Sequence, residues 1–192
     1  MVADMPLQAL QNERIVCAIM AAVKYGVPAN IMLALAEKEG GKPGLWSKNA
    51  NGTYDVGSMQ FNTRYLQDLE GYGITPETVA KPGCYAYDLA AWRVRGHLQK
   101  DGADIWTNAA NYHSRTPKYN GIYRADLQKK AGKWAVWLAA RFTTVPVDGL
   151  YTPTTRIRAT TAVVKPPVWS RRPLLTAEEV LTRTFGAPRR PV

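Results

Sequence analysis

The chain has 192 residues, of which 46% are apolar and 21% are charged. This composition is ordinary for a globular protein and excludes a wholly disordered, a collagen-like or a coiled-coil chain. The net charge of +10 suits a polyanionic partner such as nucleic acid, an anionic membrane surface or a bacterial cell wall, and charge alone does not choose among them.

The amino-terminal segment lacks the features of a secretory signal. Residues 1–14 include the acidic Asp4 and Glu13, so the basic n-region is missing. The apolar run at 15–23 is too short to span a bilayer and is followed by residues 24–26 (Lys-Tyr-Gly), not by a small-residue cleavage site. We interpret the run as a core helix and expect no membrane span. An exported form would then be either already mature or secreted by another route.

The first 142 residues have the patterns of a mainly α domain, without sustained strand alternation. Composition predicts a helix at 15–25, closed by Gly26, and another at 31–39. The Gly-, Asn- and Ser-rich stretch 40–57 predicts a loop with a small hairpin around Asn51-Gly52. Further helices are expected at 63–69, 85–99, 105–112 and 118–142, with a short capped turn at 75–77 and an interruption of the last helix near Gly132.

Composition changes near residue 143. The last 50 residues hold 7 of the 13 prolines, with eight Lys/Arg against three Asp/Glu. We therefore expect one domain over 1–142 and a flexible, basic, Pro-rich tail over 143–192. A capping-box pattern at 176–179 predicts a short amphipathic helix at 176–185. This is either a transient helix or a docking helix for a partner.

The helix at 31–39 carries two glutamates in different environments. At 100° per residue, Glu39 lies about 80° from Ile31, inside the apolar arc, whereas Glu37 lies outside it at about 240°. A carboxyl against an apolar wall has a raised pKa, as a general acid requires. The alternative is a structural carboxylate that caps backbone or pairs with Arg or Lys.

Two further segments carry polar groups suited to a carbohydrate. In the loop at 51–62, Gly57 suits a close backbone approach to a ligand or a neighbouring loop. The amides of Gln60 and Asn62 both donate and accept, as sugar hydroxyl and acetamido groups require. The segment at 109–117 places Tyr112 and an imidazole at a helix end.

Together these three segments resemble the soluble lytic transglycosylase family, whose fold is related to goose-type lysozyme. The family pattern is Glu-Ser after an Ala-Ile-Ala-type helix, then Gly-Leu-Met-Gln-Ile-Asn, then Ala-x-Tyr-Asn. It corresponds here to residues 34–40, 57–62 and 110–113, within a resemblance that covers roughly 13–125. The Asn-Gly-Thr-Tyr-Asp run at 51–55 and the Tyr-His-Ser-Arg-Thr-Pro run at 112–117 are similar to the branch attached to secretion, conjugation and pilus machines. This chain departs from the pattern at Gly40 (Ser in the family), Ser58 (Leu) and His113 (Asn).

The resemblance implies a lysozyme-like helical domain that cleaves the β-1,4 bond between N-acetylmuramic acid and N-acetylglucosamine. Glu39 is the position that matches the family's glutamate. It would protonate the glycosidic oxygen and then take the proton of the muramoyl C6 hydroxyl, giving a 1,6-anhydro product. The resemblance also implies a periplasmic monomer that opens peptidoglycan for a type III or type IV secretion, conjugation or pilus machine. Substrate contacts are expected from Ser58, Met59, Gln60, Asn62, Tyr112 and His113.

Several alternatives stay open. Asp55 is either the base of a hydrolytic muramidase or a loop residue that bonds nearby backbone. Tyr112 either hydrogen-bonds the carboxyl of Glu39 or is a buried core tyrosine. His113 either joins the acid–base chemistry or makes a structural hydrogen bond. A wall-binding assembly protein without catalysis is a third function, and a nucleic-acid binder is not expected because no binding motif is present.

The two cysteines, Cys17 and Cys84, exclude a four-cysteine zinc site, and the two histidines, His97 and His113, disfavour a histidine-rich one. We therefore expect neither a metal nor a cofactor. The periplasmic location that the resemblance implies favours a disulfide between Cys17 and Cys84. The alternative is two buried thiols.

Overall fold

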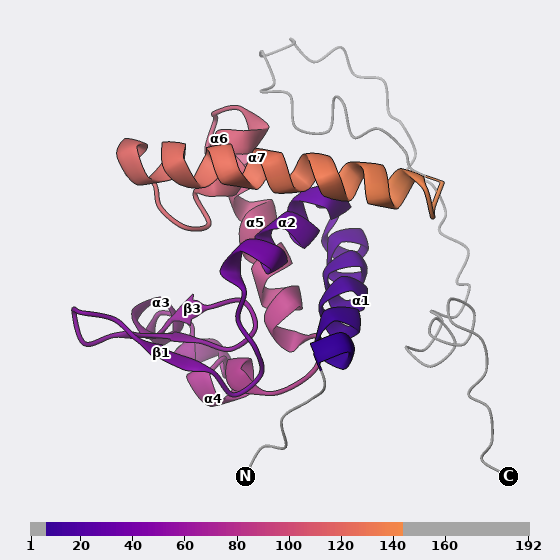
Figure 1. The fold of residues 1–192 in the computed structure, drawn as a ribbon. Coiled ribbons are helices and arrows are strands. Elements are labelled where there is room, and N and C mark those ends of the chain that lie inside the picture. The colour runs from indigo at the N-terminus through magenta and orange to yellow at the C-terminus, as the bar shows by residue number, and fades with distance from the viewer. Residues whose placement is uncertain (1–6, 144–192) are drawn as a thin grey trace, which may run out of the picture. The chain divides into compact units, whose positions relative to one another are not determined.

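The computed structural model describes residues 7–143, which form a mainly helical fold with one small sheet (Figure 1). The mainly α prediction is confirmed, and the arrangement is compatible with a lysozyme-like domain. Residues 144–192, with the helix predicted at 176–185, lie outside the described residues. In chain order the elements are α1 (Leu7–Tyr25), α2 (Ala29–Glu39), β1 (Trp46–Lys48), β2 (Tyr54–Val56), β3 (Phe61–Asn62), α3 (Thr63–Gln67), the 3₁₀ helix η1 (Glu70–Tyr72), α4 (Pro76–Ala80), α5 (Tyr85–Lys100), α6 (Ile105–Ala110) and α7 (Pro117–Ala139).

Helix α2 lies at the centre of the core. Its residues 31–36 are all buried, which explains their continuous apolar run. The helix packs against α1 on one side and against α7 on the other, and α1 also packs against α5. Figure 1 shows α7 running across α2, with the sheet beyond the opposite end of α2. The carboxyl end of α2 therefore emerges between the helical part and the sheet.

The sheet has three short antiparallel strands in the order β1-β2-β3. Trp46 pairs with Val56 and Lys48 pairs with Tyr54, so the predicted hairpin around Asn51-Gly52 is present. At its tip, the backbone amide of Thr53 donates a hydrogen bond of 3.1 Å to the side-chain oxygen of Asn51. The hairpin forms one rim of the site described below.

Several predicted elements differ in extent from those observed, and the largest difference is that α1 begins at Leu7 where a start at residue 15 was predicted. The helix predicted at 63–69 is shorter, because α3 ends at Gln67, and the 3₁₀ helix η1 follows it and is closed by Gly73 at φ 74°. The capped turn at 75–77 extends into the helix α4, with a capping box between Thr75 and Thr78. Helix α7 continues through Gly132 without a break. The burial of Ala131 and Leu138 on either side holds this stretch in the helix despite the glycine.

A disulfide joins Cys17 of α1 to Cys84 at the start of α5, across 67 residues of sequence. Cys17 is buried among the packed faces of α1 and α5, so the bond ties together two helices that already pack against each other.

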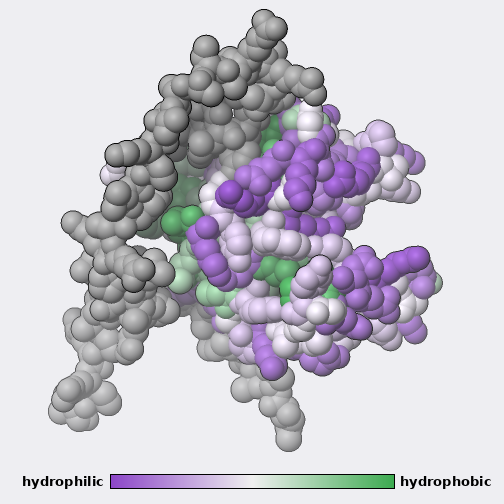
Figure 2. Space-filling view, turned by 180° about the vertical axis from the view of Figure 1, so that it is seen from behind, coloured by the Kyte–Doolittle hydropathy of each residue, from purple (hydrophilic) through white to green (hydrophobic). Residues whose placement is uncertain are grey.

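None of the helices within residues 7–143 has the length and apolar character needed to cross a membrane. The described face visible in Figure 2 is mostly hydrophilic, and its hydrophobic side chains gather between the upper and lower parts of the molecule.

Candidate functional site

Glu39 is the last residue of α2 and lies in the wall of an open pocket of about 670 Å³. Helix α2 ends there because Gly40 adopts a left-handed conformation with φ 60°. The pocket is lined by polar and aromatic side chains from the β1–β2 hairpin, from Gln60 and the β3–α3 segment that follows it, from α5 and from the α6–α7 loop. Its lining residues are Glu39, Asn49, Ala50, Asn51, Asp55, Gln60, Asn62, Tyr65, Arg93, Tyr112 and His113.

The carboxyl of Glu39 has a raised pKa. Burial is the largest cause and raises the pKa from 4.5 to about 7, with a smaller contribution from the negative charge of Asp55. A hydrogen bond from the Tyr123 hydroxyl and the positive charges of Lys38 and Arg93 act in the opposite direction. Burial outweighs them, so the carboxyl is about half protonated near neutral pH.

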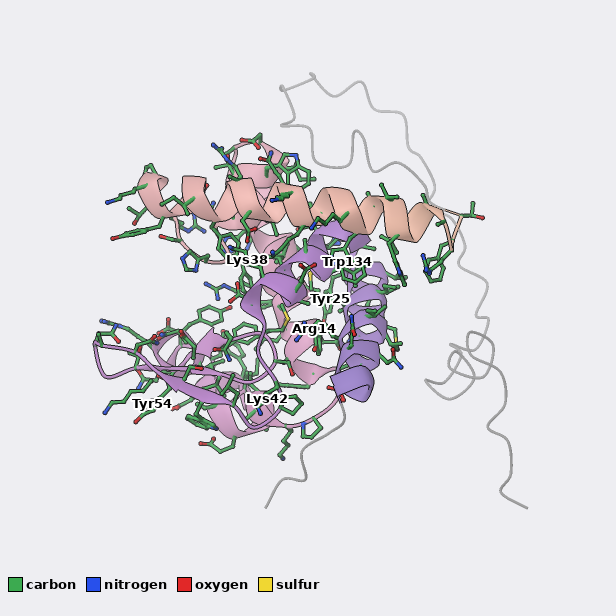
Figure 3. The ribbon with its side chains drawn as sticks, in the orientation of Figure 1. Arg14, Tyr25, Lys38, Lys42, Tyr54 and Trp134 are labelled. Atoms are coloured by element: carbon green, nitrogen blue, oxygen red, sulfur yellow. A yellow bond between two sulfur atoms is a disulfide. The ribbon has the colours of Figure 1, made fainter. Side chains whose placement is uncertain are left out.

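Tyr123 and His113 form the support of this carboxyl. Tyr123 is buried in α7 and donates its hydroxyl hydrogen bond to Oε1 of Glu39. The His113 ring stacks on the Tyr123 ring, with centroids 4.7 Å apart and planes 7° apart. The pKa of His113 is lowered, chiefly by burial and also by Lys38, which favours the neutral imidazole. The ammonium of Lys38, which is labelled in Figure 3, lies 4.6 Å from the centre of the Tyr123 ring.

Glu37 is directed to a different place. Its carboxylate accepts a hydrogen bond of 2.7 Å from the Trp134 indole and lies 3.5 Å from the Lys130 ammonium. Both partners are on α7, so Glu37 helps to join α2 to α7. The opposite positions of Glu37 and Glu39 are those that the helical wheel predicts. Of the two, only Glu39 reaches the pocket.

The loop after Glu39 is held against the 57–60 turn by an unusually close backbone approach. A side chain at Gly41 would place its Cβ 2.2 Å from the Gly57 carbonyl oxygen, so only glycine fits. Gly57, at φ 71°, in turn lies against the backbone of Val79. Of the two roles expected for Gly57, the structure supports the approach to a neighbouring loop.

Gln60 adopts φ 48°, the one positive φ of a non-glycine residue among those described. Its side-chain Nε2 donates to the Gly57 carbonyl at 2.8 Å, which stabilises the turn, while the side chain still lines the pocket. One amide group therefore both shapes the turn and remains available, through its oxygen, to a ligand.

Ser58 and Met59 do not line the pocket, although both were expected to contact substrate. Ser58 is 2% exposed and interacts with the Tyr87 side chain, and Met59 is fully buried in the core. The turn directs them inward because the neighbouring Gly57 and Gln60 hold the backbone against the adjacent loops. Met59 contributes through its backbone, since its carbonyl accepts a hydrogen bond of 2.9 Å from the Tyr112 hydroxyl.

Tyr112 therefore does not hydrogen-bond Glu39, which corrects one of the two roles considered for it. It is buried, bonds Met59, and presents its ring to the pocket. The bond to Glu39 comes from Tyr123, which lies 84 residues from it in the sequence. Sequence reasoning missed Tyr123 because it looks like any apolar position of a long helix.

Asp55 and Asn62 face each other across strands β2 and β3. The Asn62 amide donates to Asp55 Oδ1 and to the Thr53 hydroxyl, each at 2.9 Å, while its own oxygen caps α3 by accepting from the Arg64 amide. Asp55 lies in strand β2 and not in a loop. Its carboxylate accepts a hydrogen bond from the side chain of Asn62, whereas the loop alternative predicted a bond to nearby backbone. Both residues line the pocket with Glu39.

A buried polar network fixes the α6–α7 loop that carries Tyr112 and His113. Asn120 of α7 donates to the Ser114 carbonyl at 3.1 Å and to the Asn111 side chain at 2.8 Å. Asn111 in turn donates to Asp101 at 2.8 Å, and Asp101 also bonds His97. These bonds satisfy polar groups that burial would otherwise penalise, and they hold the loop against α5 and α7.

Comparisons with known proteins give low-identity similarities. No family model matches the chain. The chain is 25% identical over 123 residues to the invasion protein IagB of Salmonella typhimurium strain SL1344, covering 63% of this chain and 72% of that protein. The same values apply to the invasion protein IagB of Salmonella typhi. Protein IpgF of Shigella flexneri is 28% identical over 101 residues, covering 52% of this chain and 66% of that protein. The chain is therefore similar to these proteins over 52% to 63% of its length.

Proposed function

We propose that the protein is a peptidoglycan lytic transglycosylase that cleaves the bond between N-acetylmuramic acid and N-acetylglucosamine. The observation that carries this proposal is a single carboxyl, Glu39, with a pKa of about 7 in the wall of an open polar pocket. A group with this pKa can give a proton in one step and accept it in the next near neutral pH.

In the proposed reaction, Glu39 donates its proton to the glycosidic oxygen as the bond from that oxygen to muramoyl C1 breaks. The C6 hydroxyl oxygen of the same muramoyl residue then attacks C1, and its proton passes to the Glu39 carboxylate. The product is a 1,6-anhydro sugar, no water is consumed, and Glu39 ends protonated as it began. Tyr123 acts as a positioning residue because its hydroxyl holds the carboxyl of Glu39.

The other pocket side chains support a carbohydrate ligand. Amides of Asn49, Asn51 and Gln60 line it together with the ring of Tyr65. Amides suit hydroxyl and acetamido groups, and an aromatic ring suits the apolar face of a sugar. We assign substrate binding to these groups and to Asn62, Tyr112 and His113.

A hydrolytic muramidase is the second candidate, favoured by one observation. Asp55 lines the same pocket as Glu39, and its negative charge contributes to the raised pKa of Glu39. A second carboxylate in this position is the arrangement that hydrolysing glycosidases use to activate water or to stabilise the sugar cation.

Product analysis on purified peptidoglycan tests these proposals. Mass spectrometry should find anhydro ends, lighter by one water than the reducing ends that hydrolysis leaves. Glu39→Gln should lower the rate at least about 100-fold, the usual contribution of a general acid. Glu37→Gln, the same substitution two residues away and outside the pocket, is the matched control and should retain activity. Reducing ends that are produced by wild type and are lost in Asp55→Asn would establish the hydrolase instead. A wild-type protein that binds peptidoglycan without cleaving it would establish a wall-binding protein.

The biological setting is proposed on separate grounds. The disulfide between Cys17 and Cys84 supports an oxidising compartment, for which we propose the periplasm. Similarity to proteins named for invasion supports a role in opening the wall for a secretion, conjugation or pilus machine. We propose that the enzyme domain occupies 1–142 and that the basic tail at 143–192 contacts that machine.

A further inference from the structure

Arg93 is the one lysine or arginine among the described residues that line the pocket with Glu39. Its guanidinium lies 4.0 Å from the centre of the Tyr65 ring and 4.9 Å from that of Tyr112. It makes no hydrogen bond or ion pair with any other residue between 7 and 143, although its side chain is partly buried. A guanidinium carries five N–H donors in a planar fork that matches a carboxylate. Two tyrosine rings therefore orient a guanidinium whose donors have no acceptor among the described residues.

A second, basic pocket adjoins the first at this residue. It has a volume of about 690 Å³ and shares Arg93 and Tyr65 with the pocket that contains Glu39. Three further cations line it against a single carboxylate. We call this the basic side pocket and define it by Tyr65, Arg93, Arg95, Lys100, Asp101 and Arg115.

The cations of the basic side pocket are not equivalent. Arg95 already donates to the Tyr25 carbonyl at 2.6 Å, and Arg115 is paired with Asp101 at 3.0 Å. Arg93 and Lys100 have no such partner within the described domain. The surplus of positive charge therefore lies at the junction of the two pockets and along one wall of the second.

We infer that Arg93 binds a carboxylate of the substrate, and that the basic side pocket receives the acidic side arm of a muramoyl residue whose glycosidic bond lies at Glu39. This inference rests on the proposed function. The lactyl side arm of muramic acid projects sideways from the glycan strand. It ends either in a free carboxylate or in a peptide that carries further carboxylates. A pocket that branches from the glycan site, with positive charge at the branch point, complements both.

The test measures binding in the Glu39→Gln background, so that cleavage and the effect of Arg93 on the pKa of Glu39 do not interfere. Soluble glycan strands bearing peptides are compared with the same strands after carbodiimide conversion of their carboxylates to amides. We expect amidation to weaken binding about tenfold, the lower range for a charge-assisted hydrogen bond. Adding Arg93→Gln should remove most of this difference, and Arg93→Lys should retain part of it.

Lys129→Gln, the same loss of charge on an exposed residue of α7, is the control and should keep the full difference. Strands stripped of peptide by an amidase separate the two carboxylate sources. If amidation still weakens the binding of these stripped strands, the bound group is the lactyl carboxylate. If amidation weakens binding only for the peptide-bearing strands, the bound carboxylate belongs to the peptide.

Equal binding of native and amidated strands would overturn the inference. The inference would also be overturned if Arg93→Gln, shown to be folded by a thermal melt, kept the full difference in binding between native and amidated strands. Lys100→Gln, at the far wall, should reduce the difference by a smaller factor and provides a second variant if Arg93→Gln unfolds. Cleavage by wild type is measured separately. Its absence would therefore refute the proposed enzyme without deciding the carboxylate site.

Discussion

At the scale of single residues, the properties of Glu39 arise from opposing influences on one carboxyl group. Burial disfavours the charged form, whereas the Tyr123 hydroxyl and two nearby cations favour it. The pKa of about 7 means that burial dominates. A stronger ion pair would have made Glu39 a permanent carboxylate, unable to act as an acid at neutral pH.

This raised pKa makes folding stability depend on pH. Between pH 4.5 and 7 the folded protein holds a proton on Glu39 that the unfolded chain has released, so stability falls as pH rises through this window. Glu39→Gln removes the effect. We expect it to match wild type near pH 4 and to exceed it by up to about 3 kcal/mol at pH 8. Urea denaturation at both pH values measures this, and an offset that is the same at both would contradict it.

The hydrogen bond from Tyr123 predicts a shifted pH profile. For wild type, kcat/KM should fall above about pH 7, where the general acid loses its proton. Tyr123→Phe removes a bond that favours the carboxylate, so the pKa of Glu39 should rise and the alkaline limb should move to higher pH. The maximal rate should drop about tenfold because the carboxyl is less well positioned.

Tyr119→Phe is the matched control for this experiment, because Tyr119 lies on the same helix and is 54% exposed. It should leave both the rate and the profile unchanged. An alkaline limb that stays in place in Tyr123→Phe would show that the hydroxyl does not act on Glu39.

At the scale of elements, the junction that follows α2 depends on two backbones meeting at Gly41. A Cβ at this position would lie 2.2 Å from the Gly57 carbonyl oxygen, and backbone cannot move aside as a side chain can. Gly41→Ala should therefore lower the free energy of unfolding by about 2–3 kcal/mol. It should also impair activity beyond the loss of stability, since the same turn positions Gln60.

Gly132 provides the opposite case in the same protein. It lies inside α7, and a Cβ there would meet no atom within 4 Å. Gly132→Ala should raise stability by about 1 kcal/mol, because alanine restricts the unfolded chain and favours the helix. Denaturant unfolding of the two variants side by side should give changes of opposite sign, and two changes of the same sign would contradict the assignment of Gly41.

At the scale of the whole molecule, the disulfide between Cys17 and Cys84 limits how far the unfolded chain can expand. Its 67-residue separation corresponds to about 4 kcal/mol in the chain-entropy treatment. Cys17→Ser/Cys84→Ser should melt at a lower temperature than oxidised wild type and should not respond to reductant. Equal melting temperatures of variant and wild type under oxidising conditions would show that the bond adds no stability.

Local interactions explain the parts of the fold that sequence predicts well. The helix at 31–39, its termination by Gly40 and the hairpin around Asn51-Gly52 depend on residues within a few positions of each other. The separation of Glu37 from Glu39 also follows from helix geometry alone, because the burial of a helical position depends on its angle about the axis. The sequence by itself thus determined the mainly α architecture and which glutamate faces the apolar side.

Only the tertiary structure decided which groups meet that glutamate. Tyr123 approaches Glu39 because α7 packs across α2, and Arg93 reaches the same pocket from α5. The inward direction of Ser58 and Met59 depends on the contact between the loops at Gly41 and Gly57. Such pairings are set by how helices pack and loops approach in three dimensions, and their partners lie tens of residues apart, where periodicity carries no information.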